Sequence, residues 1–276
     1  MANKFIENLI IGKNNCDLPK TRKQQFKNLI KDNFFKLLKY SLFIGLFIVP
    51  IIIIKIIFSY SIVDMADSNK IFVYLYRESF INVFLITLVS VPVSGVSHII
   101  RKKVWNDSIL SESVFTGIRK EIKRFIFIFF IIGISNFIFQ TGSYYYSNIF
   151  DGRAIIKNVL VFINVIQFIF ILILSMYMIT MTTRYNLTFK DLVLNSFKLS
   201  IRFLFRNCLV IFIILFPWII LQILPPAYQV VVVIVISPLY YSLSILFIYE
   251  YTAYIYDEYI NKEKFSDIYK KGLKTD

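Results

Sequence analysis

Several residue types and motifs on which enzymes depend are scarce or missing. The 276 residues include 2 cysteines and 1 histidine, His98, so a zinc site would need carboxylates for nearly all of its ligands. No Gly-x-x-x-x-Gly-Lys-[Ser/Thr] loop is present, which excludes ATP hydrolysis by the P-loop route. His-Glu-x-x-His, Gly-x-Ser-x-Gly and Cys-x-x-Cys are missing as well. We therefore expect no enzymatic activity, no catalytic residue, no bound metal and no cofactor.

Glycine is also scarce, with 8 residues against 29 phenylalanines, so the apolar side chains are mostly bulky. Hydrophobic residues make up 57% of the chain and the mean hydropathy is +0.66, which exceeds the usual composition of soluble domains. The sequence predicts an all-α, polytopic membrane protein. Six segments are long enough, at about 1.5 Å per residue, to cross a hydrocarbon core of roughly 30 Å. These predicted spans are about 37–59, 80–100, 125–141, 158–181, 208–224 and 228–250.

Positive charge is distributed unevenly between the loops. Of the 31 Lys and Arg residues, 26 lie before Tyr40, in 101–124, in 182–207 or after Glu250, and only 4 lie in the opposite loops. Because cytoplasmic loops carry the excess of Lys and Arg, both termini are predicted to be cytoplasmic in a bacterial cell membrane. The net charge of +14 then reflects topology and lipid contact, and nucleic acid is not an expected partner. The predicted parts are a basic N-terminal segment (1–36), a six-helix transmembrane domain (37–250) and a cytoplasmic tail (251–276).

A basic amphipathic pattern precedes each odd-numbered span. In 111–124, Val114, Ile118 and Ile122 recur at helical spacing on one side, and basic residues occupy the other. Similar patterns occur in 190–206 and, more weakly, in 26–39. The expected architecture is therefore three tandem helical hairpins, each preceded by a basic amphipathic cytoplasmic helix. These helices either contact anionic lipid headgroups or dock onto a partner such as a cytoplasmic ATPase. The basic side chains concerned are Arg119, Lys120, Lys123, Arg124, Lys198 and Arg202.

Polar side chains inside the predicted spans gather in the outer half of the membrane. Their cost in lipid implies that they face the bundle interior or water. One hypothesis is a cavity open to the exterior, and the alternative is a set of hydrogen bonds between helices. The residues are Lys55, Asn82, Asn136, Gln140, Asn164, Gln167 and Gln222.

Two further patterns concern how the spans contact their surroundings. Small residues in the second span, Ser90, Ser94, Gly95 and Ser97, predict that another helix approaches closely there. Four tyrosines near the inner end of the sixth span predict an aromatic belt at the membrane interface. They are Tyr249, Tyr251, Tyr254 and Tyr256.

Several stretches resemble the YesL-like family of bacterial multi-pass membrane proteins. The clearest are Val114-Phe-Thr-Gly-Ile-Arg-Lys-Glu-Ile-Lys-Arg-Phe125 and Leu194-Asn-Ser-Phe-Lys-Leu-Ser-Ile-Arg-Phe203, with further similarity at 32–42 and 97–104. The resemblance covers roughly 30–255, but the Gly-rich stretch often found near span two is reduced to Gly95. It implies an accessory membrane role in carbohydrate uptake and supplies no catalytic residue.

Two other functions fit the predicted topology. Six spans, cytoplasmic termini and an amphipathic segment between spans two and three are similar to the permease subunit of an ABC exporter, which a separate ATPase drives. A stand-alone membrane scaffold or immunity protein is the third hypothesis. The sequence therefore favours an accessory or permease-like transport subunit and leaves the substrate and the oligomeric state open.

Overall fold

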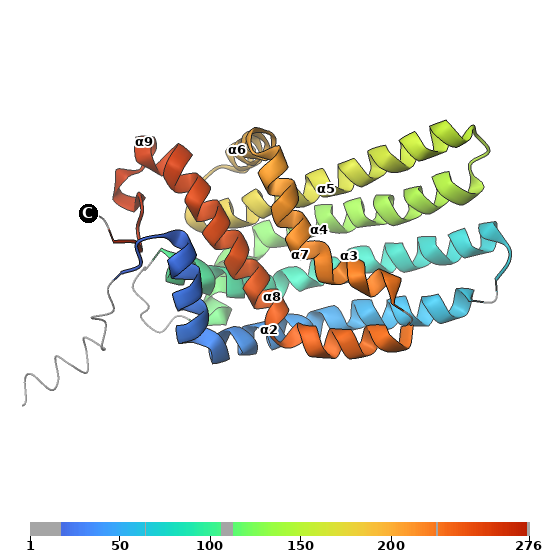
Figure 1. Ribbon diagram of the computed structural model, residues 1–276, viewed down its shortest axis with the longest axis horizontal. Coiled ribbons are helices and arrows are strands. Elements are labelled where there is room, and N and C mark those ends of the chain that lie inside the picture. The colour runs from blue at the N-terminus through green and yellow to red at the C-terminus, as the bar shows by residue number, and fades with distance from the viewer. Residues whose placement is uncertain (1–17, 64, 106–112, 225, 275–276) are drawn as a thin grey trace, which may run out of the picture.

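The protein is all-helical in the computed structural model, which describes residues 18–63, 65–105, 113–224 and 226–274 (Figure 1). No strand occurs in these ranges. The long helices are α2 (Arg22–Ile62), α3 (Ser68–Val104), α4 (Val114–Tyr144), α5 (Ala154–Arg184), α6 (Phe189–Arg202), α7 (Leu204–Ile223) and α8 (Pro226–Tyr256). The short elements are η1 (Tyr145–Ile149), η2 (Asp257–Asn261), α9 (Lys262–Lys264) and η3 (Ser266–Ile268).

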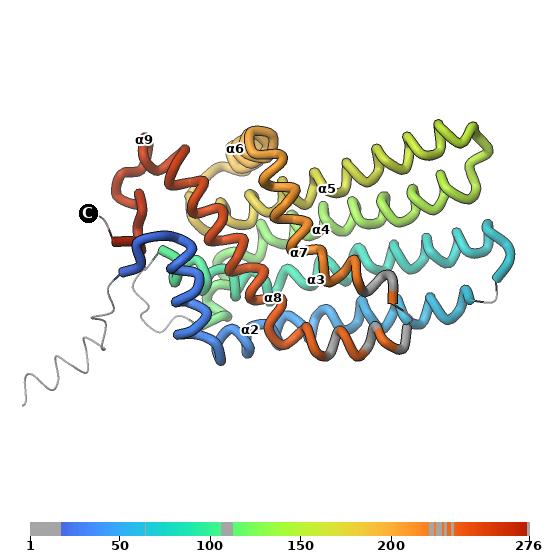
Figure 2. Tube along the Cα trace, viewed as in Figure 1, coloured from blue at the N-terminus to red at the C-terminus, as the bar shows by residue number. Residues whose placement is uncertain are grey.

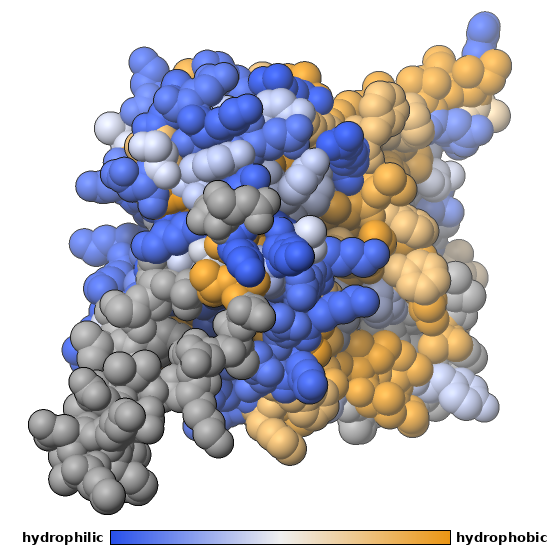
Figure 3. Space-filling view, turned by 60° about the vertical axis from the view of Figure 1, so that its left-hand side comes forward, coloured by the Kyte–Doolittle hydropathy of each residue, from blue (hydrophilic) through white to orange (hydrophobic). Residues whose placement is uncertain are grey.

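The bundle has two chemically different ends. The end on the left of Figure 1, here called the basic end, holds the start of α2, the end of α3, the start of α4, the end of α5 and helix α6. The opposite end, called the hairpin end, holds the α2–α3 and α4–α5 turns. Figure 3 shows hydrophilic residues gathered over the basic end and hydrophobic residues over most of the remaining surface in that view. This separation is what a bilayer imposes on a protein that it surrounds.

Within the described residues, four helices are long and apolar enough to cross a membrane: α2, α3, α4 with η1, and α5. Helices α6 and α7 together give a fifth candidate, although they are bent by 95° at Phe203. Several side chains near the start of α8 are outside the described residues, so the count of six spans stays a prediction. The predicted all-α class is confirmed for the described residues, and the long apolar helices are compatible with the predicted membrane protein.

Of the three predicted amphipathic segments, 190–206 is separated from most of the span that follows, and 26–39 is separated only up to Asn33. Helix α2 breaks at Asn33, which has non-helical φ and ψ of −124° and 19°, and its first three turns point away from the rest (Figure 2). Helix α6 lies across the start of α7. The segment 114–124 differs from the expectation, because it forms the first turns of a continuous α4. Residues 111 and 112 lie outside the described residues.

Glycines let α4 pack closely along α3. A Cβ atom on Gly117 would lie 2.6 Å from the His98 Cβ and 3.1 Å from the Gly95 Cα, so the two backbones nearly touch. Gly133 makes a second close approach, because a Cβ atom added to it would lie 2.9 Å from the Val83 carbonyl oxygen. Helix α4 is therefore held along α3 from its first turns onward. The close helix approach predicted at Gly95 is confirmed.

The last long helix does not form a tightly packed hairpin with α7. Instead, α8 packs mainly against α2, the first helix of the bundle. The Ser41 hydroxyl of α2 donates to the Ser237 carbonyl at 2.7 Å, and the Ser242 hydroxyl donates to the Leu37 carbonyl at 2.7 Å. Helix α8 therefore closes the described bundle by packing on α2, and the arrangement of three tandem hairpins stays a prediction.

Candidate functional site

One group of polar side chains joins α2, α3 and α4 toward the hairpin end. The Ser79 hydroxyl donates to Gln140 Oε1 at 3.0 Å, and Gln140 Nε2 donates to Asn136 Oδ1 at 3.3 Å. On the same side of α3, Asn82 Nδ2 lies 3.5 Å from Glu78 Oε1. We call these residues, together with Lys55 of α2, the α3 polar seam.

The α3 polar seam contains opposite charges on neighbouring helices. Glu78 is 5% exposed and Lys55 is half-buried, and their charges attract each other. The Asn82 side chain is 3% exposed, and its Oδ1 finds no hydrogen-bond partner among the described residues. Glu78 is absent from the predicted set because the predicted second span begins at Phe80. An acidic residue two positions before a predicted span was the signal that could have found it.

The second group joins α4 to α5. Asn164 is 6% exposed and its Nδ2 donates to the Phe139 carbonyl at 2.9 Å and to Ser143 Oγ at 3.0 Å. Gln167 Nε2 donates to Ser135 Oγ at 3.1 Å. The described outer-half residues therefore form two groups that involve different residues of α4. The contacts of Ser79 with Gln140, of Asn164 with α4 and of Gln167 with Ser135 join two helices, whereas Gln140–Asn136 and Asn82–Glu78 each lie within one helix. The side chain of Gln222 lies outside the described residues.

The predicted docking residues gather at the basic end but differ in their contacts. Arg119, Lys120, Lys123 and Lys198 are exposed. Arg124 is half-buried and its Nη2 donates to the Leu187 carbonyl at 3.0 Å, which ties α4 to the loop before α6. Arg202 is exposed, and its guanidinium lies 4.4 Å from the ring centroid of Tyr259. Arg202 therefore links α6 to η2.

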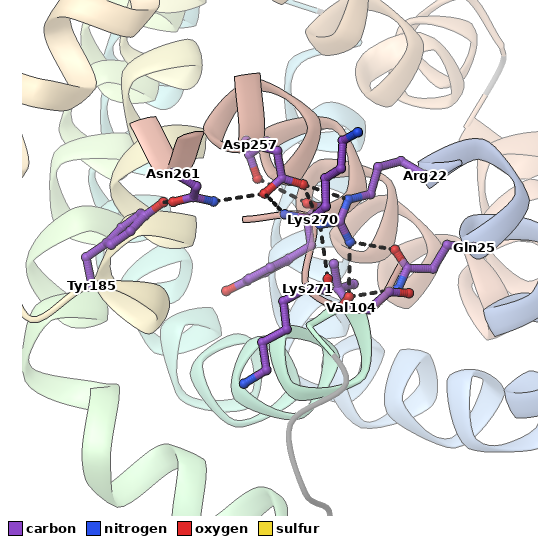
Figure 4. Close-up of polar contacts among 11 residues, drawn as sticks. Arg22, Gln25, Val104, Tyr185, Asp257, Asn261, Lys270 and Lys271 are labelled. Carbon is purple, nitrogen blue, oxygen red and sulfur yellow. Dashed lines mark hydrogen bonds and ion pairs between the residues drawn. The ribbon is translucent and has the colours of Figure 1, made fainter. Parts of the chain in front are cut away.

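The N-terminal and C-terminal segments meet at the basic end in a buried hydrogen-bond network, which we call the terminal clasp (Figure 4). Its centre is the ion pair of Arg22 and Asp257, whose side chains are 8% and 9% exposed. Arg22 Nη2 lies 2.6 Å from Asp257 Oδ2, and Nε lies 3.2 Å from the same oxygen. Arg22 also donates to the carbonyls of Val104 and Lys271.

Further contacts extend the terminal clasp to five segments of the chain. Gln25 Nε2 donates to the Val104 carbonyl at 2.8 Å and to the Gly272 carbonyl at 3.3 Å. The Tyr185 hydroxyl donates to Asn261 Oδ1 at 2.7 Å, and Asn261 Nδ2 donates to Asp257 Oδ1 at 2.9 Å. Burial raises the pKa of the Tyr185 phenol above its usual range, so this donor stays protonated.

Two tyrosines predicted to form an interfacial belt are part of the protein interior. Tyr249 and Tyr256 are 0% exposed, and their hydroxyls lie 2.7 Å and 2.6 Å from those of Thr183 and Thr180 on α5. Tyr254 is 48% exposed, as a belt residue would be. The belt prediction is therefore wrong for Tyr249 and Tyr256, because the threonine hydroxyls of α5 supply their polar partners inside the bundle.

The terminal clasp could not be found by sequence reasoning, because Arg22 and Asp257 are 235 positions apart and neither belongs to a motif. The sequence predicts the two chain ends as a separate segment and tail that flank the membrane domain, and it predicts no contact between them.

In comparisons with protein-family models, curated proteins and solved structures, no match to this chain was found.

Proposed function

We propose that this protein is a six-span integral protein of the bacterial cell membrane, with both termini cytoplasmic, that acts as an accessory or permease-like subunit of a transport system. The observation that carries the proposal is the α3 polar seam. It places Lys55, Glu78 and Asn82 between long apolar helices, where charged groups are costly and commonly mark a path for a solute or ion. The resemblance to YesL-like proteins suggests carbohydrate as the solute class.

Uptake of labelled sugars by living cells tests this function. Cells that lack the protein, or that carry Glu78→Gln, should take up at least one sugar of a panel several-fold more slowly than cells with the native chain. Glu263→Gln is the matched control, because it neutralises an exposed glutamate of α9 and should leave uptake unchanged. Protein levels in the membrane are compared by immunoblot. Unchanged uptake of every sugar in the deletion strain would refute the proposal.

A second candidate is the permease subunit of an ABC-type system with a separate ATPase. The bent pair α6 and α7 favours it, because α6 presents Lys198 and Arg202 at the basic end and continues into a predicted span. Such a helix is suited to receive the movement of a partner and pass it to the membrane. The alternative for α6 is lipid contact, since Leu194, Phe197 and Ile201 form an exposed apolar stripe.

Isolation of the tagged protein from its own membranes in mild detergent separates these alternatives. An ATPase that co-purifies with the native chain, and is lost when Arg119, Lys123 and Arg202 are reversed to Glu, would support the coupled permease. If the charge-reversed variant still binds the ATPase, the ATPase does not bind through Arg119, Lys123 and Arg202. Recovery of the protein alone would contradict the coupled permease and leave the lipid-contact interpretation of α6.

A further inference from the structure

We propose that a polar cavity at the basic end, between the start of α4 and the end of α5, binds a phosphate group. The cavity has a volume of about 360 Å³, within the roughly 300–1,000 Å³ typical of small-molecule sites. Its walls come from the first turns of α4, the last turn of α5 and the loop that follows. They are formed by Lys120, Glu121, Arg124, Thr182, Thr183, Arg184, Tyr185 and Asn186.

The charges around this cavity favour an anion. Lys120, Arg124 and Arg184 contribute three positive charges, and Glu121 contributes one negative charge. The Glu121 carboxylate lies 3.7 Å from His98 Nδ1, which gives it a partner on α3. The net charge of the walls is therefore positive. A phosphate group carries one or two negative charges and accepts hydrogen bonds on several oxygens, which matches a set of Lys and Arg donors.

The two arginines are positioned by contacts behind the cavity. The Arg184 guanidinium lies 4.8 Å from the ring centroid of Trp105, and Trp105 is fully buried. Arg124 is attached to the Leu187 carbonyl through one of its five N–H groups. Arginines held in this way lose little conformational freedom when they bind an anion, so the site is partly pre-organised.

A buried hydroxyl gives a second, independent indication of a ligand. Thr182 lines the cavity and is 5% exposed, yet its Oγ1 finds no hydrogen-bond partner in the described part of the chain. Its neighbour Thr183 is already bonded to Tyr249, and Tyr185 is bonded to Asn261. A buried hydroxyl without a partner is costly, and a phosphate oxygen in the cavity would supply one.

The phosphate group has two possible sources, a lipid headgroup or a soluble phosphorylated molecule. Exposed apolar side chains follow the cavity residues along α4. Phe127, one turn beyond Arg124, is 44% exposed and its ring lies 4.9 Å from that of Phe189 at the start of α6. Acyl chains could rest there while the headgroup occupies the cavity. The chemistry of the site is the same for both sources, and the experiment below separates them.

Binding to the full-length protein in detergent tests the proposal. The probes are short-chain phosphatidylglycerol, inorganic phosphate and, as a reference without phosphate, a short-chain diacylglycerol. Native mass spectrometry measures the bound mass, and the shift of the thermal unfolding temperature measures affinity across a titration. Lys120→Gln is compared with Lys123→Gln, because both residues are exposed cations of α4 but only Lys120 lines the cavity. Thr182→Val removes the hydroxyl at nearly constant volume.

We expect Lys120→Gln to weaken phosphate binding about tenfold, Thr182→Val to weaken it several-fold and Lys123→Gln to change it less than twofold. Binding of phosphatidylglycerol without binding of inorganic phosphate would assign the site to a lipid headgroup. Binding of inorganic phosphate would assign it to a soluble ligand. If neither probe binds, if diacylglycerol binds as tightly as phosphatidylglycerol, or if Lys120→Gln and Lys123→Gln have equal effects, the proposal is overturned.

Discussion

Replacing Arg22 with Met should open the terminal clasp. The guanidinium of Arg22 contacts both Asp257 and Gln25 and also reaches two backbone carbonyls, so a single substitution removes most of the contacts between the N-terminal and C-terminal segments. Methionine keeps much of the apolar volume. The change therefore removes charge and hydrogen bonding more than packing.

The expected cost follows from the burial of the pair. Breaking a buried ion pair by removing one partner typically costs about 3–5 kcal/mol, because the remaining charge is left uncompensated. Asp257 would keep two donors, Asn261 Nδ2 at 2.9 Å and the Lys270 amide at 3.2 Å. These donors reduce the penalty, so we expect about 3 kcal/mol.

Tryptophan fluorescence reports this event selectively. The chain has two tryptophans, and Trp105 is fully buried with the Arg22 guanidinium 5.8 Å from its ring. In a Trp218→Phe background, the emission of Trp105 during urea titration in detergent measures the opening of the terminal clasp. Arg22→Met should lower the free energy of opening by about 3 kcal/mol. The exposed Arg119, changed to Met, should alter it by less than about 0.5 kcal/mol.

Equal effects of Arg22→Met and Arg119→Met would refute the reasoning, because the ion pair would then contribute no more than an exposed charge. A fully red-shifted Trp105 emission of Arg22→Met before urea is added would instead show that the terminal clasp is already open in this variant. Both results are distinguishable from the expected loss of stability.

Three further predictions concern the helix contacts and the loop after α5. Gly117→Ala should lower the free energy of unfolding, measured by thermal denaturation, by about 1–2 kcal/mol, because the new Cβ atom would lie 2.6 Å from the His98 Cβ. Gly45→Ala is the control and should be neutral or stabilising, because its Cβ atom would lie 3.5 Å from the Tyr241 ring. Asn164→Leu should cost about 1 kcal/mol in the same assay through its lost hydrogen bonds to α4, and the exposed Asn158→Leu should cost less. Unchanged transport in a folded Asn164→Leu protein would leave only the interhelical hydrogen-bond interpretation for that residue. The difference in unfolding free energy between the native chain and Tyr185→Phe should be constant below pH 10 and fall above pH 10 by about 1.4 kcal/mol per pH unit. The reason is that the buried Tyr185 phenol stays protonated in the folded protein while the phenol of the unfolded chain ionises. A constant difference in urea unfolding free energy up to pH 11 would contradict this assignment.

The sequence by itself determined the class of the protein and several local features. Apolar runs predicted the helices that are long and apolar enough to cross a membrane, and the small residues around Gly95 predicted the close approach of α4. The basic amphipathic pattern at 190–206 identified α6. Hydropathy and helical periodicity are properties of short windows, so they can be read without knowledge of the partners.

Only the tertiary structure decided which polar groups meet. The sequence groups Asn136 and Gln167 in one outer-half set, but Asn136 bonds within the α3 polar seam while Gln167 bonds to Ser135 of α4. Adjacent helix positions are about 100° apart, so neighbours in sequence serve different interfaces. The pairing of Arg22 with Asp257 depends on how the whole bundle brings the two chain ends together. No local pattern encodes a contact across 235 residues.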